Sequence, residues 1–186
     1  MKTPTTRRTA ITALGAGVAG LATFSLLAPD RAFAAISSAA GAVAGGSLEG
    51  PNGPIQFSAF GSRLQLDDAP EPVVQGALAW YDPAGPDGAP LTIVLVTIAA
   101  YGPGDIETAR VMAGTVSVNG EGEHPFGLRL VDGGEIGAAA GTMRLVVGRA
   151  AAEVTGTPVP ADAESGFDYD VEGELTSGDV QVITFT

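Results

Sequence analysis

The chain has 186 residues, no cysteine and a formal net charge of −12. Residues 1–34 hold four basic side chains and one acid, so residues 35–186 carry five arginines, no lysine, 20 acids and a net charge of −15. Such a surface repels polyanions, which argues against nucleic acid and against an anionic membrane surface as partners. The absence of cysteine excludes disulfides and thiolate metal sites. About 150 residues suffice for one domain with its own core.

The N-terminal segment has the three parts of a signal peptide. Arg7 and Arg8 lie in a basic start without acids, residues 10–28 carry no charge, and Ala32 and Ala34 supply the small-x-small pattern of a cleavage site. The arginine pair indicates the twin-arginine export route. We therefore expect signal-peptidase recognition of both alanines and cleavage after Ala34. The alternative is an uncleaved membrane anchor, because the 19 uncharged residues at 10–28 are nearly as many as the about 20 that a membrane helix needs.

These features predict three regions. Residues 1–34 are the twin-arginine signal peptide, 35–54 a flexible lead-in rich in Ala, Gly and Ser, and 55–186 a single β-domain. The expected location is outside the cytoplasm: secreted, periplasmic or cell-wall associated. Membrane contact is expected only through the signal segment, if it stays uncleaved.

Short apolar runs, alternating with polar residues or rich in β-branched ones, fill the rest of the chain. They are separated by turns with Gly, Pro, Asn and Asp, which is typical of strands. Asn119-Gly120 is the strongest hairpin signal, because a type I′ turn needs positive φ at both central residues. The pattern predicts an all-β fold, an antiparallel β-sandwich or closed barrel of about eight or nine short strands, with no helix. The expected strands include residues 55–60, 73–81, 91–98, 110–118, 126–131, 143–147, 167–172 and 180–184.

Four segments together resemble a known family. They run in this order: Gly76-Ala-Leu-Ala-Trp-Tyr-Asp82, Gly114-Thr-Val-Ser-Val-Asn-Gly-Glu-Gly122, Leu128-Arg-Leu-Val-Asp-Gly-Gly-Glu135 and Gly173-Glu-Leu-Thr-Ser-Gly-Asp-Val-Gln-Val182. This order resembles the post-COAP type domain of exported bacterial and archaeal proteins, over residues 50–186. The chain departs from that pattern at residues 136–142. The resemblance implies an all-β extracellular module and implies no catalytic residues.

The acids at residues 168–174 form the sharpest cluster. Asp168, Asp170, Glu172 and Glu174 are spaced by two, which places all four carboxylates on one face of a strand. With further oxygens they are weak calcium candidates, since calcium takes six to eight oxygen ligands. The alternative is a solvated outer face whose like charges oppose edge-to-edge aggregation. We expect no other cofactor.

The single histidine, His124, argues against a zinc site and against a Ser–His–Asp triad, because no second His, no Cys and no nucleophile motif accompany it. We therefore expect a non-catalytic binding or cell-surface structural module. Its partner would be a protein, a glycan or an apolar small molecule. Two alternatives stay open: a small β-barrel that holds an apolar ligand, and a carboxylate-based hydrolase, since 20 acids leave many pairings.

Overall fold

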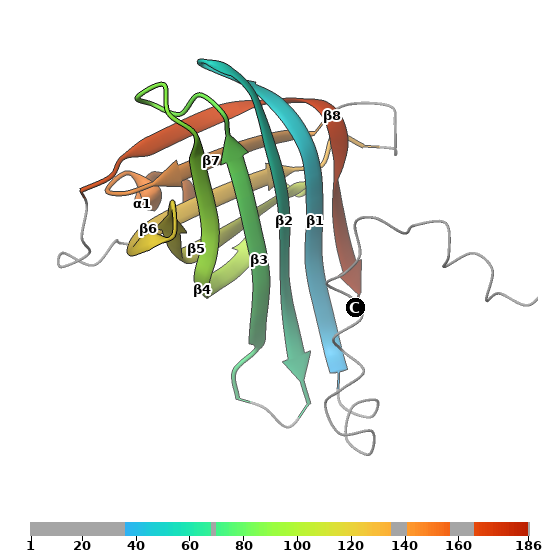
Figure 1. The fold of residues 1–186 in the computed structure, drawn as a ribbon. Coiled ribbons are helices and arrows are strands. Elements are labelled where there is room, and N and C mark those ends of the chain that lie inside the picture. Colours follow the sequence, from blue (N-terminus) through green and yellow to red (C-terminus); the bar gives the residue numbers. More distant parts are fainter. Residues whose placement is uncertain (1–35, 68–69, 135–140, 157–165, 186) are drawn as a thin grey trace, which may run out of the picture. The chain divides into compact units, whose positions relative to one another are not determined.

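The computed structural model describes residues 36–67, 70–134, 141–156 and 166–185 (Figure 1). Residues Ala35–Thr186 form one compact unit. The expected export residues Arg7, Arg8, Ala32 and Ala34 lie outside the described ranges. Within those ranges, no helix has the length and apolar character needed to cross a membrane.

Eight antiparallel strands form a closed barrel. Each strand pairs with the next along the chain, and the last pairs with the first, so the order is β1-β2-β3-β4-β5-β6-β7-β8. The all-β prediction is confirmed, and closure decides for the barrel over the sandwich. The strands are β1 (Ile36–Gly50), β2 (Gly53–Leu66), β3 (Val73–Asp82), β4 (Leu91–Pro103), β5 (Ala109–Val118), β6 (Glu121–Val131), β7 (Thr142–Val147) and β8 (Tyr169–Phe185).

β8 joins the two walls of the barrel. In Figure 1, β1 to β4 run side by side, β5 to β7 cross behind them, and β8 passes from the back wall to the edge of β1. Its first part pairs with β7 and its second part with β1. The two strands expected at residues 167–172 and 180–184 are therefore parts of one 17-residue strand.

The predicted flexible lead-in at residues 35–54 is wrong. β1 spans Ile36–Gly50 and pairs along its length with both β2 and β8. Its buried positions alternate, but they are filled by the small Ala42 and Ala44 before the larger Leu48. The strand was missed because alternation between alanine and glycine leaves little contrast in hydropathy.

Side chains fill the central lumen of the barrel. Alternate residues of every strand point inward, and eight large inward side chains have 0% exposed surface: Leu48, Ile55, Ile93, Val116, Leu128, Leu130, Leu145 and Val180. Eight strands enclose a space that side chains can just fill. No water-sized space therefore adjoins these eight residues, and a ligand site inside the barrel would lie toward one of its ends.

A short helix, α1 (Ala151–Thr155), covers part of the outer surface of β6 and β7. It lies in a part of the chain where no helix was predicted. A Cβ at Gly127 would lie 2.7 Å from the carbonyl oxygen of Ala151, so the helix can approach β6 only because this residue is glycine. Val146, which pairs with Gly127, is 1% exposed beneath the helix although it faces outward.

Candidate functional site

One end of the barrel is closed by a series of aromatic rings, which we call the aromatic end. Ring centroids are 5.9 Å apart for Phe57 and Trp80, 6.1 Å for Trp80 and Tyr169, 6.2 Å for Tyr169 and Phe167, and 5.8 Å for Phe167 and His124. Such separations are favourable for aromatic pairs. The rings come from β2, β3, β6 and the start of β8, so they connect strands of both walls.

The aromatic end contains a buried chain of hydrogen bonds. Trp80 Nε1 donates to Tyr169 Oη at 3.0 Å, and Tyr169 Oη donates to Asp82 Oδ2 at 2.9 Å. The other oxygen of Asp82 accepts a bond from the backbone N–H of Ala84. Burial raises the pKa of Tyr169, the bond from Trp80 opposes this, and Asp82 adds to the rise. Tyr169 thus stays a hydrogen-bond donor, and each polar group of the chain has a partner.

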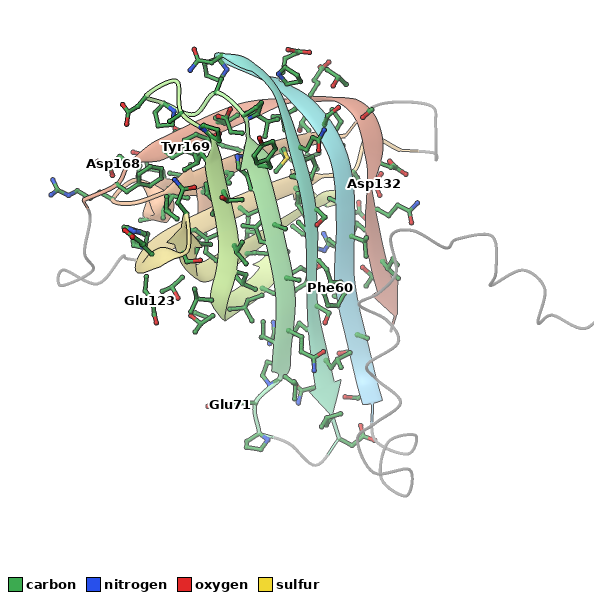
Figure 2. All side chains as sticks on the ribbon, viewed as in Figure 1. Phe60, Glu71, Glu123, Asp132, Asp168 and Tyr169 are labelled. Carbon is green, nitrogen blue, oxygen red and sulfur yellow. The ribbon has the colours of Figure 1, made fainter. Side chains whose placement is uncertain are left out.

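A shallow hollow of about 330 Å³ adjoins Tyr169. Figure 2 shows Asp168 and Tyr169 together at the start of β8, where this hollow lies. Its acids already have partners, since Asp168 Oδ1 accepts from the backbone N–H of Arg149 and Asp170 binds Arg144 through both oxygens. A ligand here would compete with existing bonds. The lining residues are Val146, Val147, Arg149, Ala150, Asp168, Tyr169 and Asp170.

The four acids proposed as calcium candidates are exposed on the outer surface of the barrel. The guanidinium of Arg144, on the neighbouring β7, lies 2.7 Å from Asp170 and 4.0 Å from Glu172. Asp168 precedes the strand, and Glu174 lies opposite Thr142. Across the described ranges, no group of three or more His, Cys, Asp or Glu side chains is placed to hold a metal ion. The position where a cation would neutralise Asp170 and Glu172 is taken by an arginine.

His124 lies at the aromatic end with its ring against Phe167. Its Nδ1 is buried and forms no hydrogen bond within the described residues. The only buried acid in these residues, Asp82, is bound by Tyr169 and Ala84. Neither group is arranged here with the second side chain that a triad or a carboxylate pair requires.

The opposite end of the barrel carries a different set of side chains, which we call the arginine rim: Arg63, Tyr101, Arg110 and Thr184. Arg63 is in phase with the buried Ala59 of β2, and Thr184 with the buried Val180 of β8. Both are exposed, as expected for lumen-facing residues where the strands end. Arg63 and Thr184 pair with the same residue of β1, Ala40, so they lie in one row. In Figure 1, the start of β1 and the ends of β2 and β8 lie together.

Arg110 brings a second guanidinium to this row. Arg110 belongs to β5 and points to the same side of that strand as the buried Met112. Its Nη2 donates to Thr184 Oγ1 of β8 at 3.1 Å, although β5 and β8 are not neighbouring strands. Its Nη1 donates to the backbone oxygens of Glu107 and Ala109 at 2.7 Å. Neither Arg110 nor Arg63 forms an ion pair with any described residue, whereas Arg129 and Arg144 do. The rim thus brings together two arginines that are not paired with a carboxylate in the described structure, while the nearby Asp132 binds the backbone N–H of Val182.

Tyr101 lies one layer deeper than the two arginines. Its ring crosses the lumen from β4 to β2, where a Cβ on Gly61 would lie 2.6 Å from its Cδ2 atom. The side chain is 5% exposed, and its hydroxyl forms no well-oriented hydrogen bond in the described structure. Burial raises the pKa of Tyr101 to about 12, against the opposing charge of the nearby Arg110. The hydroxyl therefore keeps its proton, and both the charge of Arg110 and hydrogen bonding to Arg110 act to lower its pKa.

The arginine rim was not predicted from the sequence, although a signal for it was present. Only five arginines follow residue 34, and Arg63 and Arg110 occupy the same phase of their strands as buried apolar residues. Charged residues at inward positions indicate a strand end or a site.

No family model, curated protein or solved structure matches this chain. The resemblance to the post-COAP type domain stays a prediction.

Proposed function

We propose that this protein is an exported, non-catalytic binding module whose barrel takes up a small amphipathic molecule at the arginine rim. One observation carries the proposal. At the aromatic end, the buried tryptophan, tyrosine and aspartate satisfy one another and a single ring nitrogen, His124 Nδ1, is unbonded in the described residues, whereas the rim presents two arginines without carboxylate partners and a buried hydroxyl without an acceptor. Of these three groups, only the Tyr101 hydroxyl is both buried and unpaired, and a buried unpaired hydroxyl is costly unless a partner completes it.

The apolar part of such a ligand has a matching surface. Ala40, Val74, Ile98 and Val182 are partly buried hydrophobic residues that pack against the core near the rim. Binding sites for small molecules commonly combine an apolar lining with a few placed polar groups. Because the central lumen is filled, the ligand would occupy the end of the barrel rather than its middle.

Export is the second part of the proposal. It is supported by the Arg7-Arg8 pair and by the position of the compact unit, which begins at Ala35, directly after the predicted cleavage site. The mature chain would then carry a charge of −15, which favours solubility outside the cell.

Nuclear magnetic resonance of the exported, ¹⁵N-labelled protein tests the binding function. Titration with anilinonaphthalene sulfonate, an amphipathic probe, should shift the amide signals of Ala40, Val74, Ile98 and Val182. Shifts confined to the hollow beside Tyr169 would place binding at the wrong end, and no shift at millimolar probe would overturn the proposal and favour a purely structural module.

A further inference from the structure

From the geometry of the arginine rim, we infer that the ligand is a monoanionic amphiphile whose carboxylate is bound by Arg63, Arg110 and the Tyr101 hydroxyl. This inference rests on the proposed binding function and specifies the chemical class of the ligand. It follows from the kinds of donor that the rim presents, from their spacing, and from the charge of the rest of the molecule.

The donors at the rim match a carboxylate. A guanidinium is planar, is always charged, and binds carboxylates through two parallel N–H groups. Tyr101 adds a neutral O–H from one layer deeper, where the carboxylate of an inserted molecule would meet it. One carboxylate lies at this end, that of Asp132, and its two oxygens already accept the backbone N–H groups of Gly134 and Val182. An ammonium head group would therefore face two guanidinium groups and an acid that is already bonded.

The spacing allows one small anion to meet both arginines. Two strand spacings of about 4.8 Å separate Arg63 from Thr184 through Ala40. The guanidinium of Arg110 is held at Thr184 by the 3.1 Å bond, in the same row of residues across β1 as Arg63. Arg110 is also held by two backbone oxygens, which fixes its position before a ligand arrives.

The net charge limits the ligand to a low negative charge. A protein at −15 repels multiply charged anions at long range, while a single carboxylate on an apolar body gains from burial and from local pairing. Phosphorylated or polyanionic molecules are therefore disfavoured, and short carboxylic acids with an apolar chain or ring fit best.

A series with one chain length and three head groups tests the inference. Octanoate, 1-octanol and octylammonium are titrated into the exported protein, and dissociation constants are measured from the amide shifts around the rim. Charge-assisted hydrogen bonds predict that octanoate binds at least about 10-fold more tightly than 1-octanol, with octylammonium weakest. The octanoate preference should shrink as NaCl is raised, because salt screens exposed charges.

Arginine variants test whether the arginine rim causes the preference for octanoate over 1-octanol. Arg63→Gln and Arg110→Gln should each weaken octanoate binding about 10-fold and leave 1-octanol binding nearly unchanged. Arg129→Gln is the matched control, because Arg129 lies on the outer face of β6 and pairs with Asp105. Arg63 is exposed and makes no bond in the described structure, so its replacement keeps the test valid if the Arg110 variant fails to fold.

The outcomes separate the two proposals. Equal affinity for octanoate and 1-octanol at the rim would overturn the carboxylate assignment and leave the binding function standing. The assignment also fails if Arg129→Gln weakens octanoate as much as Arg63→Gln does. Absence of binding by all three amphiphiles would overturn both the assignment and the binding function.

Discussion

At the scale of single residues, the barrel depends on polar groups placed within an apolar interior. Asp82 is 3% exposed, and a buried carboxylate is tolerated only when hydrogen bonds replace its lost hydration. Tyr169 supplies one of those bonds while accepting another from Trp80, so its single oxygen joins β3 and β8 across the lumen. The tyrosine is therefore the central member of the chain.

Replacing Tyr169 by phenylalanine should destabilise the protein by at least about 2 kcal/mol, because a buried donor and a buried carboxylate both lose a partner. Urea unfolding followed by fluorescence measures this directly, since Trp80 is the only tryptophan and belongs to the chain. Tyr81→Phe is the matched control, because that tyrosine is 43% exposed. Similar losses in the two variants would contradict the role given to Tyr169.

Features that depend only on neighbouring residues, such as the Asn119-Gly120 turn, could be predicted from the sequence. Asn119 and Gly120 have φ of 52° and 80°, as the predicted type I′ turn requires. The sequence could not place Asp82 beside Tyr169, because their contact spans 87 positions and depends on closure of the barrel. The same holds for the hydrogen bond between Arg110 and Thr184, which are 74 positions apart.

At the scale of elements, the acidic face of β8 depends on β7 for its charge balance. Arg144 lies 2.7 Å from Asp170, 3.5 Å from Glu153 of α1 and 4.0 Å from Glu172. Hydrogen bonding to Asp170 raises the pKa of Arg144, against the smaller effect of desolvation. Arg144 of β7 thus contacts acids of both β8 and α1 on the outer surface of the barrel.

Arg144→Gln should therefore lower stability by about 0.5–1 kcal/mol at low ionic strength, with the loss shrinking in 1 M NaCl as the acids are screened. Thermal or urea unfolding at two salt concentrations provides the measurement. Arg129→Gln, which removes a single exposed pair with Asp105, should cost less. A loss that is independent of salt would show that Arg144 acts through packing of its aliphatic part instead.

Most strands could be predicted because apolar residues alternate with polar ones, as in β2, or because β-branched residues fill the segment, as at the start of β4. β1 could not, because its inward positions are largely alanine and its outward positions include glycine. α1 is five residues long, too short to leave a periodic signal, and its place on β6 depends on Gly127. In such cases the two faces of the element differ too little in hydropathy for the element to be recognised from the sequence.

At the scale of the whole molecule, closure by β1 is the decisive feature. Without it, β2 and β8 would each present an unpaired edge, and an edge of that length promotes aggregation. The inward side chains Ala42, Ala44 and Leu48 would also leave the core. Cleavage at the predicted site after Ala34 would leave all of β1 in place.

Two truncations test this at the predicted cleavage site. A chain starting at Ala35 keeps all eight strands and should unfold in one cooperative transition, whereas a chain starting at Gly53 lacks β1 and should aggregate or show no transition. Urea unfolding followed by Trp80 fluorescence, with size-exclusion chromatography, distinguishes the two. If both truncations unfold alike, then β1 is not required for the barrel. The mass of the exported protein should correspond to a start at Ala35, and a start at Met1 would instead indicate an uncleaved anchor.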